Sequence, residues 1–101
     1  MEDNNQVDET EIYREWINTL KDRVARARIQ VRVDRLVHGN PGNCRNLTDG
    51  ISELKIDFGP GYLVYYSQRG THFLLLLAGG DISTQAEDIE RAKALARNYK
   101  E

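Results

Sequence analysis

The clearest pattern of apolar and polar positions lies in the middle of the chain, within residues 51–85. Leu54, Ile56 and Phe58 alternate there with three charged residues. Alternation with a period of two predicts a strand with one buried face and one face in water. We therefore expect the first long strand of a sheet over about residues 53–58.

Two further strands are predicted after this one, each preceded by a turn. Gly59-Pro60-Gly61 suits a turn, because proline fixes φ at one position and glycine accepts the positive φ needed at the next. Residues 62–67 are aromatic and β-branched, and after Arg69-Gly70 residues 73–78 are apolar throughout. An unbroken apolar run is typical of a strand covered on both faces. The pattern thus predicts a meander whose third strand is the most buried.

Two helices are predicted before the meander, because apolar residues recur there every three or four positions. The first covers about residues 9–20, where Asp8 and Glu11 resemble a capping box. The second begins after an Asp22 cap and ends at Gly39. The short link implies a helical hairpin with both apolar stripes on the sheet. The stripes are Ile12, Trp16 and Leu20 in the first helix, and Ala25, Ile29, Val33 and Leu36 in the second.

The remaining segments complete a single α+β domain over residues 1–101. Residues 1–8 form either a short edge strand or an unstructured lead, and both interpretations stay open. A short strand is expected over 45–48, followed by an Asp49-Gly50 turn. After Gly79-Gly80 a last helix reaches about residue 99. Segregated helices and an antiparallel sheet favour the α+β class.

Composition narrows the possible function classes. The chain has 101 residues, of which 40% are hydrophobic and 30% charged, as is typical of a globular domain. It contains no run of about 18 apolar residues, so we expect no membrane span. The acidic N-terminus does not resemble a secretory signal. A single cysteine, Cys44, excludes an internal disulfide and suits a cytoplasmic location.

The net charge of −2 hides an asymmetry between two segments. Residues 1–11 carry five acidic groups and no basic one, whereas residues 21–35 carry six basic groups and two acidic ones. The chain as a whole is therefore not a basic nucleic-acid binder. The basic helix is either a solvated face, which we favour on physical grounds, or a surface for nucleic acid.

Several kinds of active site are not indicated. His38 and His72 are far apart in sequence, and neither has a cysteine or carboxylate at ligand spacing, so no metal is expected. Gly79-Gly80-Asp81 lacks the lysine of a phosphate-binding loop, and we interpret it as a turn that needs glycine backbone angles. Cys44 is interpreted as an incidental thiol, because no base lies in its local motif.

The polar face of the meander offers a more specific hypothesis. If Phe58 pairs with Tyr62, Lys55 lies opposite Tyr65 on a face that also holds carboxylates and Leu63. A lysine, a tyrosine and carboxylates are able to position and protonate a phosphodiester. They are equally ordinary partners on a solvated sheet, which is the interpretation that the residues alone favour.

The ordered set of motifs from residue 12 to the last helix resembles a phage-type branch of the RelE/ParE toxin superfamily. The motifs are Trp16-Ile17, Leu20-Lys21-Asp22, Ala25-Arg26-Ala27-Arg28-Ile29, Gly39-Asn40, Ser52-Glu53-Leu54-Lys55-Ile56, Gly59-Pro60-Gly61-Tyr62, and Gly79-Gly80-Asp81 with Ser83-Thr84-Gln85. The resemblance implies a RelE-like fold, with two N-terminal helices on a twisted antiparallel sheet of about four strands and a C-terminal helix. It also implies the toxin of a type II toxin–antitoxin module, with a small helix-turn-helix antitoxin as partner.

The activity that the resemblance implies is endoribonucleolytic cleavage of mRNA, usually on the ribosome. The ribose 2′-OH attacks its own phosphate, so neither a metal nor another cofactor is required. Cations must stabilise the phosphoryl oxygens, and a proton donor must assist the leaving oxygen. The residues that match these roles are Lys55 and Arg45, with Tyr65 a weaker match. Lys21, Arg26 and Arg28 are the candidates for RNA binding.

Two departures from the family pattern lead us to predict weak or absent nuclease activity. Leu63 and Ile82 stand where the family usually has an arginine and a lysine. Loss of one charge-stabilising donor commonly lowers a rate by about 10²–10³. The alternatives are a non-catalytic member that binds antitoxin or regulates its operator, and a ParE-like inhibitor of DNA gyrase.

Overall fold

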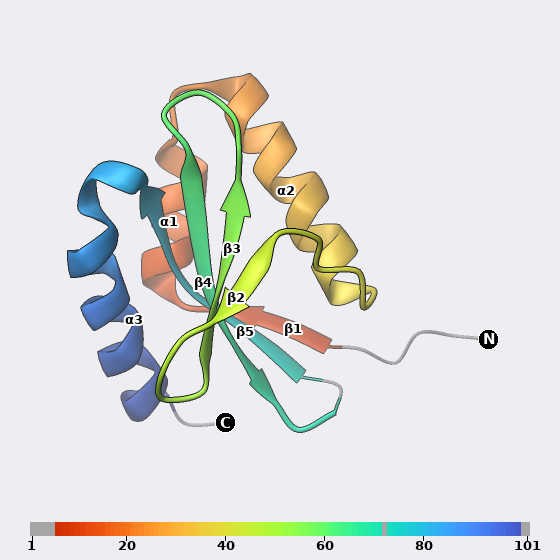
Figure 1. The fold of residues 1–101 in the computed structure, drawn as a ribbon, viewed down its shortest axis with the longest axis vertical. Coiled ribbons are helices and arrows are strands. Elements are labelled where there is room, and N and C mark those ends of the chain that lie inside the picture. Colours follow the sequence, from red (N-terminus) through yellow and green to blue (C-terminus); the bar gives the residue numbers. More distant parts are fainter. Residues whose placement is uncertain (1–5, 72, 100–101) are drawn as a thin grey trace.

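The computed structural model describes residues 6–71 and 73–99. The chain folds into a sheet with helices on both faces (Figure 1). The mixed composition of helices and strands confirms the predicted α+β class. In chain order the elements are β1 (Gln6–Glu9), α1 (Glu11–Thr19), α2 (Arg23–Val37), β2 (Cys44–Asn46), β3 (Ile51–Ile56), β4 (Tyr62–Arg69), β5 (Phe73–Asp81), the 3₁₀ turn η1 (Ile82–Thr84) and α3 (Gln85–Asn98). Within the described part of the chain, no helix is long and apolar enough to cross a membrane.

The sheet of the described residues has five strands in the order β1-β5-β4-β3-β2. Strands β2 to β5 pair antiparallel, as predicted, but β1 pairs parallel with β5, from Gln6 opposite Phe73 to Glu9 opposite Leu76. The expectation of about four antiparallel strands was therefore wrong. Of the two interpretations of the N-terminal segment, the edge strand holds for residues 6–9, and residues 1–5 lie outside the described part. A long crossover, which parallel pairing needs, is supplied by the helices and the meander.

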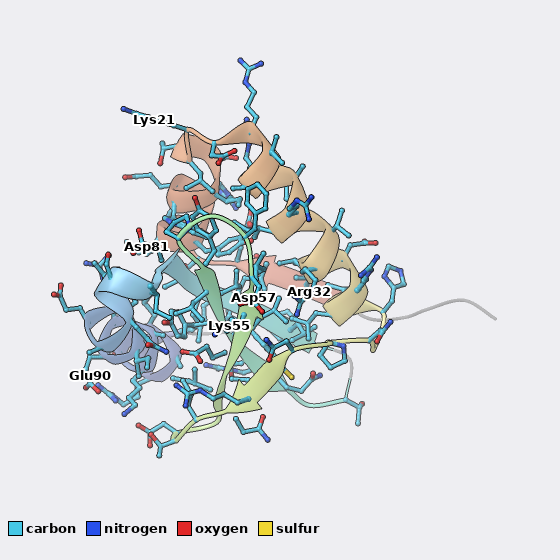
Figure 2. The ribbon with its side chains drawn as sticks, turned by 45° about the horizontal axis from the view of Figure 1, so that its top comes forward. Lys21, Arg32, Lys55, Asp57, Asp81 and Glu90 are labelled. Carbon is cyan, nitrogen blue, oxygen red and sulfur yellow. The ribbon has the colours of Figure 1, made fainter. Side chains whose placement is uncertain are left out.

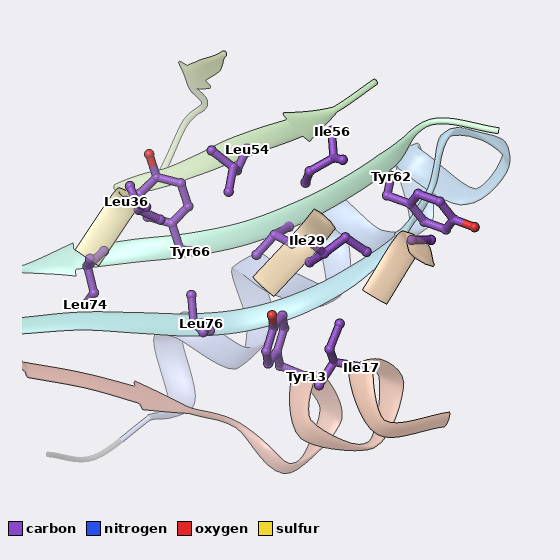
Figure 3. Packing of buried hydrophobic residues seen from close by; sticks show 12 residues of the cluster. Tyr13, Ile17, Ile29, Leu36, Leu54, Ile56, Tyr62, Tyr66, Leu74 and Leu76 are labelled. Atoms are coloured by element: carbon purple, nitrogen blue, oxygen red, sulfur yellow. The ribbon is translucent and has the colours of Figure 1, made fainter. Parts of the chain in front are cut away.

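The helical hairpin packs on one face of the sheet, as predicted, and the predicted stripe of α2 faces inward (Figure 3). In α2 the Asp22 side chain accepts hydrogen bonds from the backbone N–H groups of Val24 and Ala25, and Gly39 follows with a φ of +86°. This is the predicted N-cap and left-handed terminator. The buried residues of this layer are Tyr13, Ile17, Ala25, Ile29, Leu36, Leu54, Ile56, Tyr62, Val64, Tyr66, Leu74 and Leu76.

Helix α1 begins later and is rotated relative to the prediction. Its cap is Thr10 rather than Asp8, because Asp8 is part of β1. The Thr10 hydroxyl accepts a hydrogen bond from the backbone N–H of Tyr13 and donates one to the Leu77 carbonyl of β5. Tethering the helix start to the sheet turns Tyr13 inward and leaves Ile12 exposed.

Helix α3 covers the opposite face, which corrects the expectation of a solvated sheet surface. Glu53 is only 4% exposed and Leu63 only 1%. The predicted register was also wrong, because Lys55 pairs with Leu63 and Glu53 pairs with Tyr65. The hairpin loop takes residues 57–61 rather than 59–61, and this displaces the pairing by two positions. The buried apolar residues of this layer are Ile51, Leu63, Tyr65, Leu75, Leu77, Ala78 and Ala92.

Gly79 and Gly80 lie inside β5 and neither has a positive φ, so the predicted turn angles were the wrong reason for these glycines. Close approach is the reason instead. A Cβ added at Gly79 would lie 2.2 Å from the Trp16 ring, and one at Gly80 would lie 2.1 Å from a carboxylate oxygen of Asp88. The first glycine admits α1 and the second admits α3 to the sheet.

Candidate functional site

A hollow of about 370 Å³ opens where β2, β3, β4 and the start of α3 meet. Its walls come from four separate parts of the sequence, which the strand pairing and the short η1 turn bring together. We call it the β3 hollow. It is lined by Asn43, Cys44, Arg45, Glu53, Lys55, Leu63, Ile82 and Gln85.

A buried carboxylate, Glu53, organises the hollow. The β2–β3 register sets Arg45 directly opposite Glu53, and the Arg45 Nε donates to Glu53 Oε1 at 2.8 Å. The other oxygen, Oε2, accepts from Gln85 Nε2 at 2.9 Å, at the first residue of α3. The Glu53 carboxylate raises the pKa of Arg45, first through this hydrogen bond and then through its charge. Arg45 is therefore a fixed cation whose terminal amino groups make no hydrogen bond within the described chain.

The second cation of the hollow, Lys55, lies on β3 opposite Leu63. Its Nζ is 3.8 Å from an oxygen of the exposed Asp57 (Figure 2). Its backbone is fixed from behind, because Arg32 Nη1 donates to the Lys55 carbonyl at 2.8 Å. A lysine with a rigid backbone and a loosely paired ammonium group is well placed to contact an anion in the hollow.

Leu63 and Ile82, the two apolar positions at which the resemblance to the toxin superfamily leads us to expect cations, line the same hollow. Leu63 forms part of its floor, whereas Ile82 stands at its rim and is 48% exposed. The two predicted cations and the two apolar departures are thus brought together, although they are up to 37 residues apart in sequence. Any cation at position 63 or 82 would share the hollow with Arg45 and Lys55.

Tyr65 does not reach the hollow. Its side chain is fully buried beneath α3, and its hydroxyl has no hydrogen-bond partner among the described residues. Burial raises the pKa of Tyr65, and the nearby carboxylates of Glu53 and Asp88 raise it further. A tyrosine in this position cannot touch a phosphodiester, so we withdraw it from the set of residues that would contact substrate.

Replacement of Tyr65 by phenylalanine should therefore stabilise the protein. Removing a buried hydroxyl without a partner relieves a desolvation cost, and we expect the free energy of unfolding to rise by about 1 kcal/mol. Urea denaturation followed by circular dichroism measures this change. RNA cleavage by the variant should match that of the wild type. A loss of stability would show that the hydroxyl has a partner and would reopen its role.

The candidate RNA-binding residues lie away from the hollow. Lys21 stands in the link between α1 and α2, at a distance from Lys55 (Figure 2). Arg26 donates to the Asn18 carbonyl at 3.4 Å, and the Arg28 guanidinium lies 4.6 Å from the centre of the Phe58 ring. Both arginines belong to α2, which packs on the other face of the sheet.

Comparison with known proteins gives one relative of nearly equal length. No family model matches the sequence. A Haemophilus influenzae protein described as uncharacterized is 44% identical over 92 residues, which span 91% of this chain and 93% of that protein. The chain belongs to the family of this Haemophilus influenzae protein. The family is thus defined over almost the whole domain, and the description of its Haemophilus influenzae member names no activity.

Sequence reasoning missed Glu53 and Gln85 as members of the site. Glu53 was expected only as one of the carboxylates on a solvated face, because its buried position depends on α3, and Gln85 occurred in a motif without a predicted role. Gln85 could not be identified as a site residue from the sequence, because its position beside β3 depends on the turn that follows β5. Among the described residues, no group of three or more histidine, cysteine, aspartate or glutamate side chains is arranged to hold a metal ion.

Proposed function

We propose that this protein is a RelE/ParE-type toxin of a type II toxin–antitoxin module, with weakened endoribonuclease activity toward mRNA. It would act in the cytoplasm and be neutralised by a small antitoxin. The observation that carries the proposal is the convergence of Arg45, Lys55, Leu63 and Ile82 on one hollow. These are the four positions at which the resemblance expects cations.

The geometry supports binding of a phosphodiester more strongly than its cleavage. In the proposed reaction the 2′-OH oxygen bonds to phosphorus and the bond between phosphorus and the 5′ oxygen breaks. The proton of the 2′-OH passes to the 5′ oxygen. The terminal amino groups of Arg45 and the Lys55 Nζ would stabilise charge on the phosphoryl oxygens. Both side chains would act through their positive charge, which is electrostatic stabilisation and not proton transfer.

Glu53 is assigned a positioning role. Both of its oxygens accept hydrogen bonds, from Arg45 and from Gln85. A carboxylate occupied in this way orients the guanidinium group instead of removing a proton from substrate. Glu53 is occupied in this way, and the hollow has two cations fewer than the resemblance implies, so slow cleavage is favoured.

An RNA-binding measurement tests the assignment of the hollow. We expect the Arg45→Ala/Lys55→Ala double variant to bind a short single-stranded RNA about tenfold more weakly than the wild type. Each lost phosphate contact should also lower the slope of log affinity against log salt by about 1. Arg91→Ala, on the exposed side of α3, is the matched control and should bind like the wild type. Equal binding by the double variant and the wild type would refute the proposed phosphate site.

A non-catalytic member of the same superfamily is the second candidate, and the burial of Leu63 favours it. A leucine at the floor of the hollow provides none of the charge stabilisation that cleavage requires, whereas Arg45 and Lys55 remain available for binding. Primer extension on mRNA after induction separates the candidates, because only a nuclease produces new 5′ ends. Antitoxin binding without such ends and without growth arrest would favour the non-catalytic candidate.

A further inference from the structure

A second stripe runs along α2, beside the one that packs on the sheet. It consists of Val24, Arg28, Val31 and Arg35, which follow one another at spacings of four, three and four residues. Val24 is 55% exposed and Val31 is 50% exposed, so the apolar members of the stripe face solvent. Spacings of three and four are those by which one helix packs on another.

The stripe forms one wall of a hollow of about 500 Å³ between α2 and the β3–β4 hairpin. Ile56 and Phe58 contribute to the opposite wall. We call it the α2 groove. From Val24 to Val31 it follows two turns of helix, which is about 10 Å at 1.5 Å per residue. The groove is therefore long enough for about two turns of a second helix.

Guanidinium groups flank the apolar strip. Arg28 lies over the face of Phe58, and Arg35 makes no side-chain hydrogen bond or ion pair with any described residue. Arg32 is not available to a ligand in the same way, because it donates to the backbone carbonyls of Lys55, Pro41 and Asn43. Asp57 is the acidic residue of the lining. The groove thus offers short apolar side chains between two accessible cations.

We propose that the α2 groove binds an acidic amphipathic helix of a partner protein. Small apolar residues of that helix would pack on Val24 and Val31, and its carboxylates would pair with Arg28 and Arg35. RNA fits the groove less well, because valines offer nothing to phosphates and Arg28 already covers the Phe58 ring on which a base would stack. The proposal goes beyond the nuclease assignment and does not depend on it.

The test selects ligands from a phage-displayed library of random 16-residue peptides on the wild-type protein, with counter-selection on Val31→Asp. Enriched peptides should carry aspartate or glutamate together with apolar residues at helical spacing. Synthetic copies should bind Val31→Asp and Arg35→Glu at least about tenfold more weakly than the wild type in fluorescence polarisation, as for a central contact residue. Circular dichroism verifies that both variants are folded.

Two matched controls lie outside the groove. Ile12→Asp places the same charge at another exposed apolar position, on α1, and Arg23→Glu reverses a charge at the start of α2. Both should bind the peptides within about twofold of the wild type, a difference below 0.5 kcal/mol.

Three results would overturn the proposal. The first is a selection that yields no binders, or binders without acidic enrichment, and the second is binding that Val31→Asp leaves unchanged. The third is evidence that the groove binds another ligand, either RNA or a second copy of this chain. A 12-nucleotide RNA whose affinity falls in Val31→Asp and Arg35→Glu would identify the groove as a nucleic-acid site. A dimer in light scattering that Val31→Asp dissociates would identify a second copy as the occupant.

Discussion

The Leu63→Arg/Ile82→Lys double variant is expected to cleave mRNA at least about 100-fold faster than the wild type. Both positions line the β3 hollow with Arg45 and Lys55, so each new cation would reach the same phosphate. One preorganised donor commonly contributes about 10²–10³ in rate, and two act on the same developing charge. Cleavage of an end-labelled mRNA in the presence of ribosomes measures the gain, and growth arrest on induction should accompany it.

Two further variants separate charge from shape in this experiment. Leu63→Gln/Ile82→Gln adds polar groups of comparable length without charge and should leave the rate near that of the wild type. Ile82→Lys alone lies at an exposed rim and should raise the rate without loss of stability. Because Leu63 is buried, the double variant must first be shown to be folded by circular dichroism. A folded double variant as slow as the wild type would refute the proposal that the loss of these cations weakens the activity.

Gly79→Ala should lower the free energy of unfolding by about 2–3 kcal/mol. The new Cβ would lie 2.2 Å from the Trp16 ring, so α1 and β5 must separate or the ring must leave its place. Overpacking of this kind typically costs about 1–3 kcal/mol, and 2 kcal/mol lowers the Tm of a domain of this size by about 10 °C. Thermal unfolding followed by circular dichroism measures the effect.

A double-mutant cycle identifies the cause of this loss. In a Trp16→Ala background the ring is absent, and Gly79→Ala should then cost less than about 1 kcal/mol. The coupling between the two substitutions should therefore be favourable. Equal costs in both backgrounds would show that backbone conformation, and not the ring, requires glycine at this position.

The elements were predictable where local chemistry decides them, and α2 is the clearest case. Its Asp22 cap, its buried stripe and its Gly39 terminator are all signals within one segment of sequence. The start of α1 was not predictable in this way. Thr10 rather than Asp8 caps the helix because a strand far along the chain, β5, holds Asp8 in a sheet and accepts a hydrogen bond from Thr10.

The candidate site was predictable in its cations but not in its surroundings. Arg45 and Lys55 were identified by motif, and the structure places both in one hollow. The burial of Glu53 and Tyr65 was not foreseen, because their strand pattern predicts a solvated face. The face is covered by α3, whose approach depends on the absence of a side chain at Gly80. No periodic pattern of apolar residues in the sequence predicts this contact between α3 and the sheet.

The parallel pairing of β1 with β5 has a consequence for synthesis on the ribosome. Residues 6–9 leave the exit tunnel before their partners at 73–76, which lie far from them in the sequence. A pairing between such distant segments forms slowly, because a long loop must close, at a cost in entropy, before any stabilising contact forms. The edge of β5 therefore stays unpaired until these two segments meet, and the sheet is completed only after residues 73–76 have emerged.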